Sequence, residues 1–412
     1  MKRTTVAGSL VAITALTLSA CGSGASSGSD GSGSIKIMQI AAEAVVGSGN
    51  YSDGVKAAVA SINAKGGIGG HKIDLEVCDA GAAATLGDPN STAQCAQKAV
   101  KDKVVALVGT FSYFSQNIYP YIKRAGIPNI NQQFTAPDQT EDLSYPQAGN
   151  EPVAYAGVGL MLAQNGCKKI AVMAVGTEAQ TKSLVVNPFL DGIKYGKAQA
   201  LSPQYIDTNA TDYAAPVATA RAAGADCIAF EGSASNTAPL MKAIDESGGP
   251  LKVGVNDISV PKEVMAALSP TDQAQLLVET LNYPLAWQTD GIKQFESDMK
   301  TYNPKATIVD YTQLEWGYVK TFQQAAEAVL KDGKDITPAN VKAALDKICQ
   351  TSNDVAPSSN FCKPGPIKKL PRVSETSVAF MTIENGEYKP QGTGVDSLVD
   401  VGPALTDFDP ND

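Results

Sequence analysis

The stretch GVKAAVASINAKGGIGGHKIDLEVCD, residues 54–79, indicates the fold class more clearly than any other part of the sequence. From Val55 to Ile62, apolar residues recur at the spacing of an amphipathic helix. Residues 73–77 then alternate between apolar and polar, as in a strand, and the glycine-rich residues 66–70 turn the chain between the two. A phosphate-binding loop would need the order strand, loop, helix, so this stretch predicts a structural turn rather than a nucleotide site.

Short apolar runs alternate with helical patterns through the first 130 residues. Strands are expected at 35–40, 73–77, 104–108 and 127–130, and helices at 51–64, 92–101 and 116–124. Strands that alternate with helices predict right-handed crossovers and a parallel, doubly wound sheet.

The pattern restarts at Asn150, which we expect to cap a helix that has Pro152 in its first turn. Further strands are expected at 169–175, 204–206, 227–230, 252–255 and 276–279, helices at 213–223, 237–246, 291–302, 311–331 and 338–348, and a hairpin at 377–389 that turns at Asn385-Gly386. The chain therefore has the pattern of two α/β units.

The N-terminus is typical of an export signal. Lys2 and Arg3 precede an apolar run, residues 6–18, which is shorter than the roughly 20 residues that a membrane-spanning helix needs. The segment Leu18-Ser19-Ala20-Cys21 resembles a bacterial lipobox, which implies a signal peptide at 1–20 and lipidation of Cys21; an ordinary secreted protein is the alternative. Residues 21–34 are rich in glycine and serine and predict a flexible tether.

Length and charge narrow the functional class. About 380 residues follow the signal and tether, which is enough for two lobes. A net charge of −9 and a pI near 4.9 argue against a nucleic-acid partner. Apart from Cys21, six cysteines remain, which suits an oxidising compartment, although six cysteines allow fifteen pairings.

The unit at residues 54–79 resembles the first βαβ unit of the Leu/Ile/Val-type periplasmic binding proteins, which serve branched-chain amino-acid ABC transporters. Further motifs follow in that family's order: VVALVG at 104–109, AGIP at 125–128, FTAP at 134–137 and EWGYVKTFQQAAEA at 315–328. The resemblance extends from about residue 35 to about residue 390 and depends on the order and spacing of these motifs together.

The resemblance implies a two-lobed type I periplasmic-binding-protein fold, in which each lobe is a doubly wound, mainly parallel sheet flanked by helices. The expected lobes are residues 35–149 plus 284–355, and 150–283 plus 372–405. The hinge crossings are expected near 148–151, 281–285 and 362–371, where Pro284 and the prolines at 364, 366 and 371 favour extended chain.

The resemblance also implies a ligand site between the lobes, at the carboxyl ends of the strands. In the first lobe, Ser112 and Thr135 match residues that hold a substrate's carboxylate and ammonium, and Gln133 matches a main-chain contact. An apolar wall is also expected from Phe134, with Phe111, Tyr113 and Phe114, and core packing is the alternative for these aromatic residues. Turn chemistry and helix capping are the alternative for Ser112 and Thr135.

The second lobe departs from the family. The family's amino-acid binders carry tyrosines where this chain has Ser233, Ala234 and Ser235, which puts a branched-chain amino acid in doubt. The candidates that remain at its strand ends are Thr177, Glu231 and Asp257, and an acid there suits an ammonium group, with a solvated surface acid as the alternative.

Within this frame the cysteines are expected to pair as Cys78–Cys95, Cys167–Cys227 and Cys349–Cys362. Enzyme activity is not expected: the chain has one histidine, His71, and no G-x-S-x-G, H-E-x-x-H or C-x-x-C motif. No metal and no cofactor are expected.

The function implied is that of a bacterial, extracytoplasmic, lipid-anchored monomer on the outer face of the cell membrane. It would deliver a small polar solute, an amino acid or related carboxylate, to an ABC permease. A lipoprotein that senses the same solutes and signals to a membrane receptor is the alternative.

Overall fold

The computed structural model describes residues 33–410 except 43, 46–48, 82–86 and 134. The predicted signal peptide, Cys21, most of the tether and Phe134 therefore lie outside the described residues. In the described part, no helix has both the length and the apolar character that crossing a bilayer requires.

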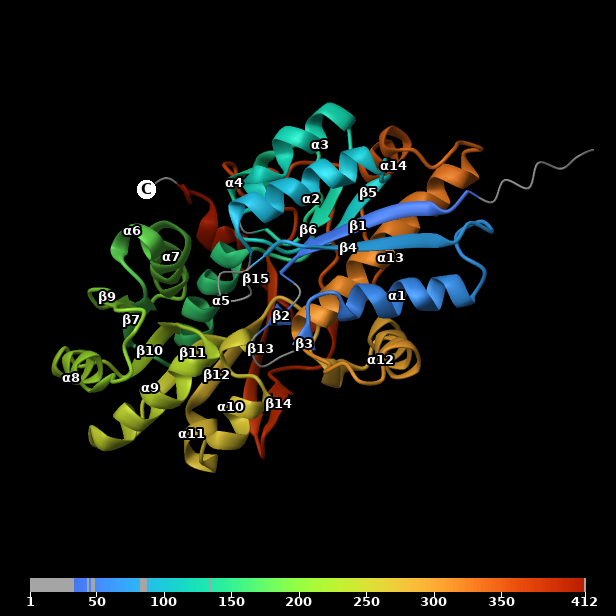
Figure 1. The fold of residues 1–412 in the computed structure, drawn as a ribbon. Helices are drawn as coiled ribbons and strands as arrows, with labels where there is room; N and C mark the ends of the chain where they lie inside the picture. The colour runs from blue at the N-terminus through green and yellow to red at the C-terminus, as the bar shows by residue number, and fades with distance from the viewer. Residues whose placement is uncertain (1–32, 43, 46–48, 82–86, 134, 411–412) are drawn as a thin grey trace, which may run out of the picture. The chain divides into compact units, whose positions relative to one another are not determined.

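The first sheet has four parallel strands in the order β4-β1-β5-β6 (Figure 1). Their bounds are β1 Ile35–Ala41, β4 Ile73–Asp79, β5 Ala106–Thr110 and β6 Asn129–Asn131. Ile37 of β1 packs into the core on one face of this sheet and Met38 into the core on the other. The central strands are buried on both faces because helices cover both.

Two groups of helices cover this sheet. On one face lie α2 Pro89–Lys101 and α3 Tyr119–Ala125, and the core on the other face includes α1 Asp53–Ala64, α12 Asp290–Tyr302, α13 Asp310–Lys331 and α14 Pro338–Leu345. Short elements of this part are β2 Ala44–Val45, β3 Gly49–Asn50, a 3-10 turn at Ser115–Asn117 and α4 Ala136–Thr140. The first sheet and these helices form the first lobe.

The second sheet follows the order β14-β13-β12-β11-β10-β7-β8. Two further strands lie outside this path: β9 pairs with β7, and β15 pairs with β13. The bounds are β7 Lys169–Val175, β8 Gln199–Ala200, β9 Gln204–Ile206, β10 Cys227–Glu231, β11 Lys252–Asn256, β12 Leu276–Thr280, β13 Ser377–Glu384, β14 Glu387–Pro390 and β15 Val399–Asp400. Pairing is parallel from β8 to β12, and β13 and β14 form the predicted antiparallel hairpin. Asn385 and Gly386 have φ of 55° and 76°, as a tight hairpin turn requires.

Helices also cover both faces of the second sheet. On one face lie α5 Glu151–Gln164 and α7 Asn187–Tyr195, and on the other lie α8 Ala214–Ala222, α9 Ala234–Glu246 and α10 Lys262–Ala267. The remaining elements are α6 Glu178–Thr181, a π-helical turn at Lys182–Val186, α11 Pro270–Gln275 and 3-10 turns at Asp257–Ser259, Leu285–Trp287, Val395–Ser397 and Gly402–Leu405. The second sheet and its helices form the second lobe.

Asn150 caps α5 as predicted: its side chain accepts a hydrogen bond of 3.1 Å from the N–H of Val153. Several boundaries differ from the sequence prediction, three of them at the following elements. The strand expected at 104–108 lies at Ala106–Thr110, the helix expected at 116–124 is a 3-10 turn followed by α3, and the helix expected to end at 348 ends at Leu345. Pro120, which has no N–H to donate, stands in the first turn of α3.

The chain passes between the lobes three times. At the first crossing, Ala148 packs in the core of the first lobe and Val153 in the core of the second. At the second crossing, Leu281 contacts both cores. At the third crossing, Phe361 belongs to the core of the first lobe and Ile367 to that of the second. The first lobe is therefore built from two separate parts of the sequence.

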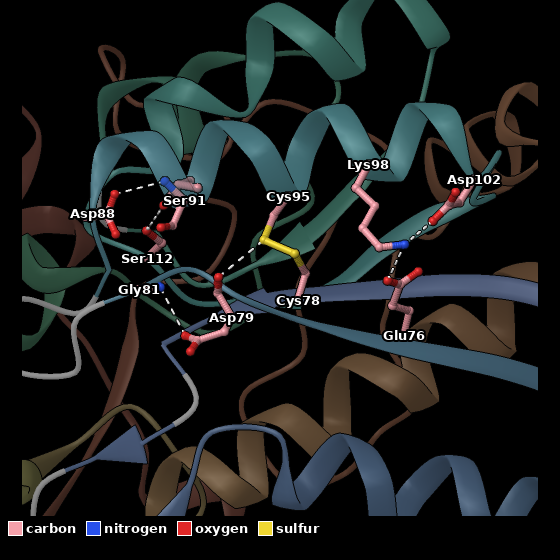
Figure 2. The surroundings of a disulfide bond; sticks show 11 residues. Glu76, Cys78, Asp79, Gly81, Asp88, Ser91, Cys95, Lys98, Asp102 and Ser112 are labelled. Atoms are coloured by element: carbon pink, nitrogen blue, oxygen red, sulfur yellow. Dashed lines mark hydrogen bonds and ion pairs between the residues drawn. A yellow bond between two sulfur atoms is a disulfide. The ribbon is translucent and has the colours of Figure 1, made fainter.

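Three disulfides, Cys78–Cys95, Cys167–Cys227 and Cys349–Cys362, match the pairings that the resemblance implies. Figure 2 shows Cys78 on β4 joined to Cys95 on α2, and further along α2 Lys98 pairs with Glu76 and Asp102. Among the described residues, no bridge joins the first lobe to the second.

We expect the three bridges to stabilise the protein unequally. Replacing Cys167 and Cys227 with alanine opens a loop of 60 residues and should lower the free energy of unfolding by about 4 kcal/mol in the chain-entropy model. The same change at Cys349 and Cys362, which close 13 residues and are exposed, should cost about 3 kcal/mol. Chemical unfolding of both double variants measures the difference, and a larger loss at the second pair would contradict it.

Candidate functional site

In each lobe, the loops that follow the parallel strands hold most of the predicted site residues (Figure 1). Carboxyl ends of parallel strands lie at the same edge of a sheet, where open α/β folds bind ligands. The first lobe contributes residues after β5 and β6, and the second contributes residues at the ends of β7, β10 and β11.

Ser112 follows β5 and is 0% exposed. Its hydroxyl lies 3.1 Å from that of Thr92 on α2 and accepts a 3.1 Å hydrogen bond from the N–H of Phe114. Ser112 is drawn in Figure 2 beside the start of α2. Its hydroxyl therefore takes part in the turn, as the alternative interpretation of this residue states.

Thr135 is the N-cap of α4 and forms a capping box with Asp138. Its hydroxyl lies 2.8 Å from that of Ser115 and donates to Asp138 at 2.9 Å. Burial raises the pKa of Asp138, while hydrogen bonds from Ser115 and the Thr135 N–H oppose that shift. Thr135 is thus held rigidly near the end of β6.

Gln133 follows β6 and is buried. Its amide nitrogen donates to the carbonyl oxygens of Ala148 and Gly149, at 3.3 and 3.5 Å. Gln133 therefore contacts the first crossing between the lobes.

Two predicted residues of the second lobe have structural partners. Thr177 caps α6 through a capping box with Gln180. Asp257 is buried in the 3-10 turn after β11, and its carbonyl accepts a 3.1 Å hydrogen bond from the hydroxyl of Tyr388. Of these two, Asp257 lies closer to the other acids, because its charge influences the pKa of Glu279.

Glu231 ends β10, and its carboxylate accepts a 2.9 Å hydrogen bond from the N–H of Val175 on β7. Burial raises the pKa of Glu231 to about 7, and the bond from Val175 opposes the shift. The carboxyl group therefore changes charge near neutral pH.

Glu231 is brought close to two residues that sequence reasoning did not assign to the site, Glu151 and Tyr155 in the first two turns of α5. Burial raises the pKa of Glu151 to about 7, and the charge of Glu231 contributes to that shift. Both carboxylates also raise the pKa of Tyr155 beyond the effect of its burial.

Tyr113 reaches this group from the first lobe. Its pKa is raised by burial first and then by the charges of Glu151 and Glu231, which places its hydroxyl near both acids. The residue is nevertheless 44% exposed, so the meeting point of the two lobes is reached by solvent. Sequence reasoning expected Tyr113 in an apolar wall, and in the structure its hydroxyl also lies near the two acids.

The ends of three neighbouring strands place polar side chains in one row, which we call the strand-end row: Glu231 on β10, Asn256 on β11 and Glu279 on β12. Asn256 and Glu279 are register partners. Two residues earlier, Ala229 and Leu277 pack in the core formed with α5, and a Cβ on Gly254 would contact Val158 and Leu162 of α5. Side chains two apart on a strand share a face, so the strand-end row faces α5.

An aromatic group of the first lobe lies beside Tyr113. The rings of Tyr51 and Phe111 stack with centroids 3.8 Å apart, and Tyr311 of α13 lies 4.6 Å from Tyr51. The charges of Tyr311, Glu315 and Tyr113 add to the effect of burial in raising the pKa of Tyr51. Tyr51 and Tyr311 lie far from Phe111 in sequence, so no local pattern indicates this grouping.

The arrangement suits binding better than catalysis or metal coordination. In the described part of the chain, the one group of possible metal ligands is Cys167, Asp226 and Cys227, and its two sulfurs form a disulfide. The acids Glu151 and Glu231 lie near the tyrosines Tyr113 and Tyr155.

The sequence profile of a family described as periplasmic binding protein matches residues 44–363. No curated protein matches the chain.

Solved structures share the fold at low sequence identity. A fatty-acid ABC transporter substrate-binding protein from Thermomonospora curvata is 13% identical, with a TM-score of 0.69 over 90% of this chain and 94% of that one. A leucine-binding protein from Thermotoga maritima is 17% identical, with a TM-score of 0.66 over 89% and 99%. A branched-chain amino-acid transporter substrate-binding protein from Streptococcus pneumoniae, in complex with isoleucine, is 15% identical, with a TM-score of 0.68 over 87% and 98%.

The family match covers most of the chain, and the order of strands and helices agrees with the two-lobed type I fold. Members of this family bind solutes and are not enzymes. The chain belongs to the periplasmic binding protein family.

Proposed function

We propose that the protein is an extracytoplasmic lipoprotein that captures a small polar solute, an amino acid or related carboxylate, between two closing lobes and delivers it to an ABC permease. The observation that carries this proposal is the two-sheet fold of the periplasmic binding protein family, with polar side chains of each lobe at the carboxyl ends of its parallel strands. Polar groups of both lobes meet at the carboxyl ends of their strands, where a solute that contacts both would favour the closed form.

We place the lobes at residues 35–149 plus 284–355 and 150–283 plus 372–405, with hinges near 148–151, 281–285 and 362–371. Hydrogen bonds at the crossings support this division. The amide of Gln313 donates to the carbonyls of Tyr283 and Val355, at 2.9 and 2.6 Å. Arg372 donates to the Ser144 carbonyl at 2.6 Å and stacks over the ring of Tyr145. Closure would bend these segments and leave both sheets intact.

The proposed contacts in the first lobe are Ser112, Gln133, Phe134 and Thr135, and those in the second are Thr177, Glu231 and Asp257. The hydroxyls of the buried Ser112 and the half-buried Thr135 are already held by hydrogen bonds. Such groups contact a solute with little loss of side-chain entropy, which favours binding.

Attachment through Cys21 would keep the protein near its permease. Solved structures with this fold include substrate-binding proteins of ABC transporters, which favours transport over sensing. A sensor would retain solute binding and closure but would copurify with a receptor instead of a permease.

Replacing Ser112 or Thr135 with alanine should weaken solute binding. Loss of one hydrogen bond to a charged ligand group costs roughly 1.5–3 kcal/mol, or about 10- to 150-fold in affinity. Titration calorimetry against an amino-acid panel measures the loss, and X-ray scattering should show the wild-type protein becoming more compact when solute is added. Thr140→Ala, an exposed change on the same helix as Thr135, is the control. Wild-type affinity in both variants would exclude these contacts.

Replacing Cys21 with serine should move the protein from the membrane fraction to the soluble extracytoplasmic fraction, because the lipid attachment site is lost. Fractionation followed by immunoblotting measures the partition, and metabolic labelling with a fatty acid reports lipidation directly. If the variant partitions like wild type, the lipid anchor is not at Cys21.

A further inference from the structure

We propose that the Cys349–Cys362 disulfide is a redox-sensitive restraint on the hinge. The intact bridge holds residues 350–361, which we call the bridged loop, against the three crossings between the lobes. Reduction of the bridge by a dithiol releases this loop, so that the lobes reorient more freely and hold a solute less tightly while both sheets stay folded. This inference rests on the proposed closure of the two lobes and adds a means of controlling it.

The bridged loop forms neither a helix nor a strand, so the disulfide and a small set of hydrogen bonds fix its conformation. Beside the bridge, the N–H of Phe361 donates to the carbonyl oxygen of Ile348 at 2.8 Å. Within the loop, the N–H of Thr351 donates to the carbonyl of Ser359 at 3.1 Å, and the N–H of Ser359 donates to the hydroxyl of Thr351 at 3.0 Å. Irregular chain loses much conformational entropy on ordering, and a covalent closure removes part of that cost.

The bridged loop contacts the second crossing through its backbone. The N–H of Tyr283 donates to the carbonyl oxygen of Val355 at 3.0 Å, and the amide of Gln313 on α13 donates to the carbonyls of both residues. The carbonyl of Asp354 accepts a 2.6 Å hydrogen bond from the hydroxyl of Thr289, the N-cap of α12. These bonds fix the loop both to the crossing and to the helix that follows it.

A side chain of the same loop supports the first crossing. The amide of Asn353 donates to the side-chain oxygen of Gln147, which also accepts a 3.0 Å hydrogen bond from the hydroxyl of Thr321 on α13. Gln147 precedes Ala148, whose φ of 58° is a left-handed conformation that a residue other than glycine keeps only where its surroundings hold it. Release of Asn353 therefore removes part of the support for a strained residue at the start of this crossing.

The third crossing leaves the bridged loop directly at Cys362. The N–H of Asn360 donates to the hydroxyl of Ser374 at 3.0 Å, and the ring of Phe361 meets that of Tyr145 edge to face, with centroids 5.4 Å apart. All three crossings therefore contact one short segment, and one disulfide closes that segment.

Some polar atoms around the bridged loop lack partners in this arrangement of the lobes. In the described part of the chain, Nε2 of Gln147, Oε1 of Gln313 and Oγ of Ser359 are buried without a hydrogen-bond partner. A buried polar atom without a partner costs free energy, so a movement of the crossings that supplies partners offsets part of its own cost. Bending at this place is therefore less costly than in a fully paired region.

Thiol reagents reach this bridge more easily than the other two. Cys349 and Cys362 are both exposed, whereas Cys95, Cys167 and Cys227 are at most 3% exposed. The thiolate of a dithiol attacks one sulfur of the bridge, and its second thiol then resolves the mixed disulfide. Two electrons and two protons pass to the protein, which gains two thiols, and the dithiol becomes a disulfide. Because access controls this exchange, the exposed bridge opens first.

The test compares the full mature chain, purified in detergent, before and after limited treatment with dithiothreitol. Alkylation and peptide mapping should show Cys349 and Cys362 reduced first. Hydrogen exchange followed by mass spectrometry should then be about tenfold faster in the peptides that contain Tyr283 and Phe361, and unchanged in β1 and β7.

Solute affinity is measured on the same two samples by calorimetry, with leucine, glutamate and lysine as probes. The solute contacts themselves are unchanged, but side chains at the crossings must be ordered again when the lobes close. Ordering one such side chain corresponds to a roughly two- to tenfold loss of affinity, which we expect for any probe that binds the oxidised protein.

Double alanine variants separate the hinge from overall stability. Replacing Cys349 and Cys362 should reproduce the reduced protein, and limited dithiothreitol treatment should then have no further effect. Replacing Cys167 and Cys227 opens a loop of 60 residues at the amino ends of β7 and β10, away from the crossings. This control should keep wild-type exchange at Tyr283 and wild-type affinity.

The outcomes separate the inference from the proposed function. Unchanged exchange at the crossings after reduction overturns the inference, whether or not a probe binds. Faster exchange with unchanged affinity for a bound probe also overturns it, as does a loss of circular dichroism, because the bridge would then hold the fold and not the hinge. If no probe binds the oxidised protein, the proposed function fails, while the exchange rates still decide whether the bridge restrains the crossings.

Discussion

Parallel pairing of strands is the constraint on which the rest of this structure depends. A parallel strand cannot follow its neighbour through a tight turn, so the chain must cross a face of the sheet, here by helices such as α1 and α9. Every such crossover returns the chain to the edge of the sheet where the previous strand began. The carboxyl ends of all the parallel strands therefore lie together at the opposite edge. In each lobe, the polar residues of the candidate site lie at this carboxyl edge of the sheet as a result of the topology.

Desolvation then changes the charge balance of two acids at this edge. Burial raises the pKa of Glu151 and Glu231 to about 7, because the buried carboxylates lose their solvation by water. Natural proteins usually place such acids beside lysine or arginine. Here the N–H of Val175 donates to Glu231 at 2.9 Å, and Tyr113 lies near Glu151.

The sequence predicts the fold much better than the site. Strand and helix patterns such as residues 54–79 are local, and the cap at Asn150 and the turn at Asn385-Gly386 follow from single residues. Glu151 directly follows the helix cap Asn150 in the sequence. An acid in the first turn of a helix is normally explained by the helix dipole, so this position does not suggest a ligand contact. Its contact with Tyr113 depends on the packing of two lobes, which no local pattern encodes.

The return of the chain to the first lobe affects the order in which the protein folds during synthesis. The four strands of the first sheet are complete by Asn131, yet α13, which packs on one of its faces, begins only at Asp310. Until then the core that contains Ile37, Val108 and Ile130 lacks α13 and is covered only in part, by α1 and α12. The second lobe, except for its C-terminal strands, is made in between. We therefore expect a chain that stops before α13 to aggregate more readily than the full chain.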